Sequence, residues 1–586
     1  MNISTVYIKN FRNFEDFEIN FTEGFQTIIG ENNIGKSNFY YAIRLILDQY
    51  MSYKDRNLGV KDFYNFEELD LDSHIIISLD LFGNDLSSFP NLHALNTGHN
   101  TARITYLFAH KSKFIDDGTV FDEIKIEDFK WKLYGAGNSY TVDNILTFGE
   151  IYFNDIEGIN LFHISAFRNI YSDIQGKSKS LLSQYCLSRE NSATELDSLK
   201  GILDTASTQL NELSFIPDIK EKVEDTHVEV VGRNFSYPLS LEFKSEFDED
   251  IWNQLNLYYE HNGQNIPIEL LGLGQKNIIY LSLFISRLRN EYNPHELNIL
   301  LIEEPESHLH PQLQKILFSN LQDLNNIQVF MTSHSTHIAS DCEYKNLNVV
   351  YKDLNNKVKS FSPFISNVLT NREPSFLKRY LDATRSELFF ASGIIFVEGI
   401  AEQFLIPIIA KEIYKVDLLE HNISVISIHC RYFEPFMKLL QNNGFEIPAS
   451  IIIDGDSGEI PVGETETTAV QNARAFEVPD RVKVYSGTNT LETDLFPNIN
   501  TNNSYLVNCF RNLGHEESYN NLYHEVETNG EDWNKELIKR IDGTITKGRF
   551  AQELSLYIDE SFVIPSYIED AIIFVCEARG IEFIDE

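Results

Sequence analysis

The sequence of 586 residues predicts an α/β protein made of two domains in tandem. Three observations support this prediction. Short aliphatic runs with strand character alternate with amphipathic helical patterns along both halves of the chain. A glycine-rich turn at 30–37 joins one such run to a helix, and in the second half separate aliphatic runs end in carboxylates. The length also fits several domains of about 150 residues each.

The composition has one strong bias, which is its charge. The chain has 48 Lys and Arg against 87 Asp and Glu, so its formal net charge is −39. This charge argues against broad non-specific binding of nucleic acid, which relies on many basic side chains contacting phosphates. A local basic groove, or metal ions that bridge carboxylates to phosphate, would still permit DNA binding.

The sequence carries no sign of a membrane segment or a secretory signal. No uninterrupted apolar run reaches the roughly 18 residues of a membrane span. The opening "MNISTVYIKNFRNF" alternates like a first strand and carries charges early, unlike a signal peptide. The five cysteines are scattered without C-x-x-C spacing. We therefore expect a cytoplasmic protein without a zinc site or disulfides.

The first chemical motif is "GENNIGKS" at 30–37, which matches G-x-x-x-x-G-K-[ST]. It follows a run ending in Thr-Ile-Ile and precedes the helical "NFYYAIRLIL", the context that a P-loop requires. Backbone N–H groups and the Lys36 ammonium would hold phosphates, and the Ser37 hydroxyl would bind Mg²⁺. The cofactor-binding residues expected here are Gly30, Asn32, Asn33, Gly35, Lys36 and Ser37.

Three later stretches fit the same nucleotide site. In "ILLIEEPE" an apolar strand delivers two carboxylates to a sheet edge, where we expect Glu303 near Mg²⁺ and Glu304 orienting or deprotonating water. A solvated acidic turn is the other explanation, which the preceding aliphatic residues disfavour. "FMTSHS" places His334 where it could sense the γ-phosphate. "LGLGQKN" at 271–277 suits a phosphate at a helix start, although an ordinary helix entry explains it nearly as well.

The second half repeats the pattern of carboxylates after aliphatic strands, in "GIIFVEGIAE" and "ASIIIDGDSGE". The two glutamates of "EGIAE" are four residues apart at a helix start, so both can point at one site. "TLETDLF" adds two more carboxylates, and "TKGRFAQEL" places a lysine ahead of a helix. The residues expected at one site are Glu398, Glu402, Asp454, Asp456, Glu492, Asp494 and Lys547.

Six carboxylates and one lysine suit two divalent metal ions that flank a phosphodiester. One ion would activate water and the other would stabilise the leaving oxygen, while Lys547 offsets charge in the transition state. Glutamates four apart can also be a solvated helix face, and Asp-Gly is a common turn dipeptide. Because both patterns follow aliphatic strands in one domain, we favour the site. The residues predicted to be catalytic are Glu398, Asp454, Lys547 and, in the first half, Glu304.

We expect a first domain at 1–370, a linker at 371–392 and a second domain at 393–586. Within the first domain, the stretch at about 172–225 has Leu and Ile at helical spacing. We interpret it as a helical insertion, such as an arm or a dimerising hairpin.

The motifs "IIGENNIGKSNF", "LGLGQKN", "LLIEEPESHLHP" and "TSHS" resemble those of ABC-type ATPases of the SMC and RecF kind. "FVEGIAE", "IIIDGDSGE" and "TKGRFAQEL" resemble a TOPRIM domain, the metal-binding module of topoisomerases, primases and some nucleases. Together they resemble the OLD family of ATP-dependent endonucleases, which includes the nuclease subunit of the Gabija anti-phage system. The implied fold is α/β: an N-terminal ABC-type (SMC/RecF-like) P-loop ATPase domain with a helical insertion, then a C-terminal TOPRIM domain.

The resemblance implies an ATP-regulated endonuclease that cuts DNA with Mg²⁺, for which Mn²⁺ or Ca²⁺ would substitute or tune activity. It implies defence against phage or other foreign DNA, and ATPase halves paired head-to-head in a homo-dimer or tetramer. The implied partner is a helicase, or a retron reverse transcriptase with its small DNA. Since nuclease chemistry needs metal ions and water rather than ATP, we interpret the nucleotide as a switch.

Two other functions stay open at this point. One is an SMC/RecF-like DNA-binding repair ATPase without nuclease activity, against which the intact carboxylates and Lys547 speak. The other is a nuclease toxin directed at RNA or tRNA.

The chain also departs from the family pattern in three places. "LGLGQKN" lacks the usual Ser-Gly-Gly core, Glu303 stands where many relatives have Asp, and residues 429–431 replace a glycine-rich turn.

Overall fold

The computed structural model describes the larger part of the chain. The described residues are 1–66, 69–83, 96–98, 100–115, 123–166, 180–181, 201–202, 205, 257–261, 264–291, 296–324, 327–369, 372–382, 384–429, 433–461 and 464–583. The chain divides into two compact units, Met1–Ala166 with Pro294–Glu586, and Phe167–Asn293.

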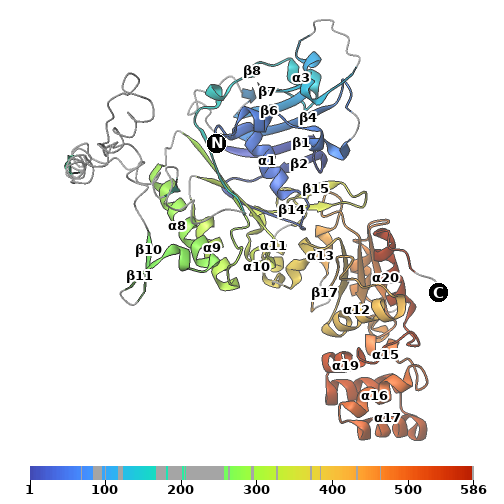
Figure 1. Ribbon diagram of the computed structural model, residues 1–586. Coiled ribbons are helices and arrows are strands. Elements are labelled where there is room, and N and C mark those ends of the chain that lie inside the picture. The colour runs from blue at the N-terminus through green and yellow to red at the C-terminus, as the bar shows by residue number, and fades with distance from the viewer. Residues whose placement is uncertain are drawn as a thin grey trace, which may run out of the picture. The chain divides into compact units, whose positions relative to one another are not determined.

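The larger unit begins with an antiparallel sheet in the order β2-β1-β4-β6-β7-β8, with β5 beside β6 (Figure 1). Its strands are β1 (Asn2–Phe11), β2 (Phe14–Asn20), β4 (His74–Phe82), β5 (Asn96–Gly98), β6 (Thr101–His110), β7 (Phe129–Gly135) and β8 (Glu150–Ile151). Two short helices, α2 (Tyr53–Arg56) and α3 (Val142–Leu146), lie in its connections.

A second sheet has the order β15-β14-β3-β13-β12-β9 and is parallel except for the β14–β15 hairpin. Its strands are β3 (Phe25–Ile29), β9 (Ile159–Ile164), β12 (Leu297–Glu303), β13 (Gln328–Ser333), β14 (Leu347–Lys352) and β15 (Val358–Phe361). The runs predicted to be strands before the P-loop, the carboxylate pair and His334 form β3, β12 and β13. Because these three strands are parallel neighbours, the groups that follow them meet at one sheet edge.

Helix α1 (Lys36–Leu47) starts at the P-loop lysine and lies in the core that the two sheets share. Its apolar residues face both ways, and Phe39, Ile43 and Leu47 are buried. A helix that is apolar on nearly every side needs cover on nearly every side. The packing of α1 between the two sheets therefore holds the helix in place, and with it the P-loop residues at its start.

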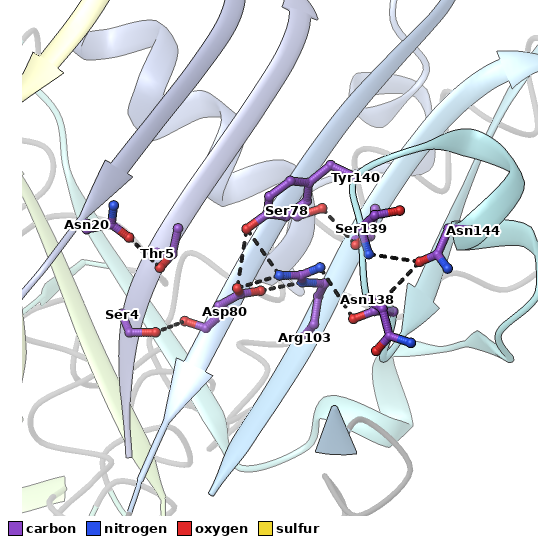
Figure 2. Close-up of polar contacts among 12 residues, drawn as sticks. Ser4, Thr5, Asn20, Ser78, Asp80, Arg103, Asn138, Ser139, Tyr140 and Asn144 are labelled. Carbon is purple, nitrogen blue, oxygen red and sulfur yellow. Dashed lines mark hydrogen bonds and ion pairs between the residues drawn. The ribbon is translucent and has the colours of Figure 1, made fainter. Parts of the chain in front are cut away.

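The antiparallel sheet carries a polar cluster around Asp80 on β4 and Arg103 on β6 (Figure 2). Arg103 donates from Nε to Asp80 Oδ1 at 2.5 Å and from Nη2 to Asp80 Oδ2 at 2.6 Å. The Tyr140 hydroxyl lies 3.1 Å from Arg103 Nη2, and its ring stacks on Tyr7 with centroids 3.9 Å apart. Two backbone N–H groups of the same loop donate to Asn144 Oδ1. These contacts attach the connection between β7 and α3 to the sheet.

The C-terminal part is built on a parallel sheet in the order β17-β16-β18-β19. Its strands are β16 (Gly393–Val397), β17 (Ile423–Ser427), β18 (Ala449–Ile453) and β19 (Val482–Ser486). Both strands predicted to end in carboxylates are central in this sheet. Its helices are α12 (Ile400–Tyr414), α13 (Glu434–Leu439), α14 (Thr468–Arg474), α15 (Leu491–Leu495), α16 (Asn503–Asn512), α17 (Glu516–Asn529), α18 (Trp533–Arg540), α19 (Lys547–Leu554) and α20 (Ser566–Ala578). One hydrophobic core joins the sheet to most of these helices.

The remaining helices of the larger unit are α9 (Pro311–Gln322), α10 (Thr336–Asp341) and α11 (Glu373–Tyr380). Helix α11 and a short 3-10 helix (Arg385–Phe389) occupy the segment that we expected to be a linker at 371–392. The domain limits drawn there stay predictions. In the described ranges, no helix is both long and apolar enough to cross a lipid bilayer.

In the smaller unit, β10 (Tyr258–His261) pairs with β11 (Gln264–Pro267), and α8 (Leu273–Glu291) follows. Helix α8 begins inside "LGLGQKN", where the sequence predicts a helix start. The predicted insertion at about 172–225 lies outside the described residues, apart from 180–181, 201–202 and 205.

Candidate functional site

The P-loop runs from the end of β3 to the start of α1, and two of its glycines have no room for a side chain. A Cβ on Gly30 would lie 2.2 Å from the carbonyl oxygen of Val350. Gly35 has φ 111°, and a Cβ there would lie 2.0 Å from Asn13 Nδ2. Other side chains are strained in that backbone region. Asn32 and Asn33 lie exposed at the turn of the loop.

Lys36 is buried and is held by the loop itself. Its Nζ donates to the carbonyl oxygens of Gly30 and Glu31, at 2.8 Å each, and lies 3.2 Å from His334 Nδ1. Burial lowers the pKa of Lys36 to about 8, although nearby carboxylates, Glu304 first, favour its charged form. The ammonium therefore lies at the loop with its charge only partly compensated, as a phosphate-binding lysine requires.

His334 links this lysine to the predicted water-orienting glutamate. Because the Lys36 ammonium can only donate, His334 Nδ1 accepts, and the proton of a neutral imidazole lies on Nε2. Nε2 is 3.4 Å from Glu304 Oε1. Burial and Lys36 lower the pKa of His334 to about 4, so the ring is neutral near pH 7. The structure thus brings Lys36, His334 and Glu304 together.

Glu303 ends β12 and contacts two other residues. Ser37 Oγ donates to Glu303 Oε2 at 3.0 Å, and His163 Nε2 lies 2.9 Å from Glu303 Oε1. Burial raises the pKa of Glu303, but the hydrogen bond and charge of His163, the Ser37 hydrogen bond and the charge of Arg44 together outweigh burial and lower the pKa below its ordinary value. Glu303 is therefore a charged carboxylate beside the Ser37 hydroxyl, the donor pair expected for Mg²⁺ next to a nucleotide.

Two residues of this site were missed by the sequence analysis. His163 lies on β9, 140 positions before Glu303, and no motif marks it. Glu306 is buried, and its Oε1 accepts from Ser333 Oγ at 2.6 Å and from the His334 N–H at 3.0 Å. Burial raises the pKa of Glu306. The "EEPE" stretch of the sequence could have indicated Glu306, because it follows the two assigned glutamates.

The second site lies where β16 and β18 end. Glu398 follows β16, and its Oε1 accepts from the Asp454 N–H at 3.1 Å. Asp454 follows β18, and its Oδ1 accepts from the Leu491 N–H at 3.1 Å. These bonds tie the ends of two neighbouring strands to the start of α15. Glu402, in the first turn of α12, is buried beside the Gly399 backbone.

The electrostatics show that these carboxylates are close together. Burial, then Glu402 and Glu398, raise the pKa of Asp454 to about 8, with Lys547 acting in the opposite direction. Burial and Glu492 also raise the pKa of Glu402. Clustered carboxylates with raised pKa values are the arrangement that a divalent cation relieves.

Lys547 starts α19 and lies 3.0 Å from Glu492 Oε2. Burial disfavours its charge, but Glu492 and Asp454 outweigh burial and raise the pKa of Lys547. The side chain is 38% exposed, so its ammonium can also meet a substrate. Lys547 is therefore the cation that interacts with Glu402, Asp454 and Glu492, while Glu398 contacts Asp454.

The structure also describes the two remaining predicted ligands, Asp494 and Asp456. Asp494 accepts from the Thr488 N–H at 2.7 Å and from the Asn489 N–H, so its carboxylate holds the loop after β19. Asp456 has a left-handed backbone, with φ 42°. A residue that the sequence did not indicate, Tyr567 of α20, lies beside the carboxylates, and its pKa is raised by burial and by Asp494.

The donor set fits hard divalent cations, because every side chain in it offers carboxylate oxygens. Among the residues that the structure describes, no three acidic, His or Cys side chains form a ready metal-binding group.

Comparisons with known proteins agree with both halves. A family model described as "AAA ATPase domain" matches residues 1–144 and 150–339. A model described as "Overcoming lysogenization defect protein-like, TOPRIM domain" matches residues 389–456. The chain is 24% identical to Endonuclease GajA of Bacillus cereus (strain VD045), covering 70% of this chain and 68% of that protein.

The chain is also similar to one further relative and to one solved structure. The chain is 22% identical to the Old nuclease of Escherichia phage P2, covering 73% of this chain and 72% of that one. The solved C-terminal region of the Xanthomonas campestris pv. campestris OLD protein is 28% identical, with a TM-score of 0.27, over 33% of this chain and 96% of that one. The first family model alone spans more than half of the chain, so the chain has an AAA ATPase domain, and the second model together with the nuclease relatives identifies it as an OLD-family protein, in which an OLD-like TOPRIM domain follows that ATPase domain.

Proposed function

We propose that this protein is a metal-dependent DNA endonuclease whose TOPRIM site is regulated by nucleotide bound at the ATPase domain. The observation that supports cleavage best is the group of carboxylates around Asp454, namely Glu398, Glu402 and Glu492, with the Lys547 ammonium 3.0 Å from Glu492. The named relatives are nucleases, and one of them is an endonuclease. Defence against phage or other foreign DNA is part of the proposal and rests on the family.

In this proposal, Glu398, Glu402, Asp454 and Glu492 hold divalent metal ions, with Asp456 and Asp494 at the margin of the site. Metal ions bound there would supply activated water and stabilise the leaving oxygen. Lys547 neutralises charge that develops on the phosphodiester. Magnesium is the expected ion, and Mn²⁺ or Ca²⁺ would substitute for it or tune the activity. At the ATPase site, Lys36 holds phosphate, and Ser37 and Glu303 orient the Mg²⁺ of the nucleotide.

Regulation has a physical route through Glu31 of the P-loop. Its backbone carbonyl accepts from Lys36, and its carboxylate Oε1 accepts from Ser392 Oγ at 2.7 Å and Asn422 Nδ2 at 2.9 Å. Ser392 precedes β16, and Asn422 precedes β17. All of these residues belong to the same compact unit. A phosphate that draws Lys36 away from the Glu31 carbonyl would change a loop that is bonded to the TOPRIM sheet.

We further propose a homo-oligomer, a dimer or tetramer, in the cytoplasm. A helicase, or a retron reverse transcriptase with its small DNA, is the proposed partner, on the strength of the family alone. A repair ATPase without nuclease activity and an RNA- or tRNA-directed toxin are the rivals that the following test separates.

The test is cleavage of plasmid, single-stranded DNA and tRNA with Mg²⁺ or Mn²⁺ by the parent, Glu398→Ala, Asp454→Ala and Lys547→Ala. Residues that act as a unit lose activity non-additively, so each single change should remove most DNA cleavage and paired changes should add little. Glu527→Ala, which removes an exposed carboxylate on α17, is the matched control and should cut like the parent. Thermal melts confirm folding.

Folded Glu398→Ala and Asp454→Ala proteins that cut DNA at the parental rate would overturn the nuclease proposal. The repair ATPase would then be the better description. Cleavage confined to tRNA would favour the toxin.

A further inference from the structure

The ATPase site contains a contact that none of its motifs includes. His163 lies on β9, the strand next to β12, and its register partner is Leu301, two residues before Glu303. His163 Nε2 is 2.9 Å from Glu303 Oε1, while Ser37 Oγ donates to the other carboxylate oxygen. Because a charged carboxylate can only accept, Nε2 carries the proton and donates it. Glu303 is therefore held from two sides.

We propose that His163 is a positioning residue of the ATPase, which fixes the side chain of Glu303 so that its second oxygen faces Ser37 and the metal ion of a bound nucleotide. A glutamate has one more rotatable bond than an aspartate, and fixing it costs more side-chain entropy. The histidine supplies the restraint that this longer side chain needs. A residue that orients a metal-binding side chain commonly changes metal affinity by about 10–100-fold when it is removed.

The imidazole is itself packed in place. Its ring meets the ring of Tyr40 edge-on, with centroids 6.3 Å apart, and the Tyr40 hydroxyl donates to the carbonyl oxygen of Ile302 on β12. Tyr40 is fully buried in α1. The helix that carries Ser37 and the strand that carries Glu303 therefore both contribute to placing the ring. Such support is what keeps a binding residue in one geometry.

This inference rests on the ATPase half of the proposed function and not on the nuclease half. The test uses the full chain with His163→Ala, His163→Gln and Asn160→Ala. A glutamine amide can place a donor near the position of Nε2. Asn160 is the matched control, because it lies on the same strand and bonds instead to Glu296 and Asn298. Two quantities are measured, the Mg²⁺ dependence of binding of a fluorescent ATP analogue and the rate of ATP hydrolysis.

We expect His163→Ala to raise the Mg²⁺ concentration for half-maximal nucleotide binding by about tenfold. Nucleotide binding in EDTA should stay within about twofold of the parent, because Lys36 and the P-loop are unchanged. His163→Gln should recover most of the Mg²⁺ response, and Asn160→Ala should behave like the parent. A purely structural role for His163 would instead weaken binding with and without Mg²⁺ alike.

The most discriminating experiment compares His163→Ala in the parent with His163→Ala in a protein that also carries Glu303→Asp. An aspartate carboxylate stops one methylene short of His163, so removing the histidine there should shift the Mg²⁺ midpoint by less than twofold. An equal shift in both backgrounds, or a parental midpoint for folded His163→Ala, would overturn the proposal. A parent that binds no nucleotide at any Mg²⁺ concentration would overturn the ATPase assignment and this inference with it. Loss of DNA cleavage alone would bear only on the nuclease proposal.

Discussion

Glu304 is the residue of the ATPase site whose predicted role is easiest to test. It follows β12 with a left-handed backbone, φ 42°, and its carboxylate faces Nε2 of His334, whose other nitrogen accepts from Lys36. A non-glycine residue in this conformation is strained, and such strain is typical of functional sites. The carboxylate is also 38% exposed, so water can reach it.

We predict that Glu304→Gln retains ATP binding but hydrolyses ATP slower by ~10²-fold or more, a usual contribution of a general base. The amide has the same shape and can still accept from His334. Single-turnover hydrolysis and nucleotide affinity measure the two effects. Glu343→Gln, an exposed glutamate of the same domain, is the control. Hydrolysis at the parental rate would mean that Glu303 or another group orients the water.

In the antiparallel sheet, two ion pairs each join neighbouring strands and differ in how far their side chains are exposed. Asp80 and Arg103 lie directly opposite each other on β4 and β6, with side chains 22% and 13% exposed. Lys132 and Glu150, on β7 and β8, are both 32% exposed. Hydrogen bonds to charged groups stabilise more when they are shielded from water, and exposed pairs contribute little.

We predict that Arg103→Ala lowers the free energy of unfolding by about 2–3 kcal/mol, because it removes both guanidinium hydrogen bonds to the Asp80 carboxylate and leaves that charge with only the 3.3 Å hydrogen bond from the Tyr140 hydroxyl. Lys132→Ala should cost less than about 1 kcal/mol. Urea unfolding followed by circular dichroism compares the two variants. Equal losses would show that shielding does not distinguish these pairs.

Across the whole molecule, the contact on which the proposed regulation depends is the one from Glu31 to Ser392 and Asn422. The nucleotide loop is bonded to residues at the start of the TOPRIM strands, whereas Glu398 and Asp454 lie at the ends of β16 and β18. The strands therefore lie between Glu31 and the carboxylates, and we propose that a coupling free energy between the two sites is transmitted along them.

We predict that Asn422→Asp reduces the effect of ATP on DNA cleavage. The new carboxylate would face Glu31 and replace a hydrogen bond by repulsion. The ratio of cleavage with ATP to cleavage without it should move at least fivefold closer to one, rising if ATP inhibits the parent and falling if ATP activates it. ATP hydrolysis should stay within about twofold. Asn512→Asp makes the same charge change at an exposed residue of α16 and serves as the control. A parental ratio in Asn422→Asp would contradict this route.

The sequence alone determined the parts of this protein that are local in the chain. A P-loop needs only its glycines, its lysine and a strand–helix context, so "GENNIGKS" could be interpreted directly. The aliphatic runs before Glu303, Glu398 and Asp454 predicted strands, which the structure contains, because burial on both faces of a parallel sheet demands such runs. The OLD-family assignment followed from the same short motifs.

Only the tertiary structure decided which distant residues meet. His163 is 140 positions from Glu303, and Ser392 and Asn422 are 361 and 391 positions from Glu31. These contacts depend on strand order and register, which no local pattern encodes. For the same reason the sequence grouped Asp494 with the other carboxylates, whereas the fold gives its oxygens to the Thr488 and Asn489 N–H groups. Local motifs fix the chemistry of a side chain, and the long-range pairing of strands fixes the partners on which that chemistry acts.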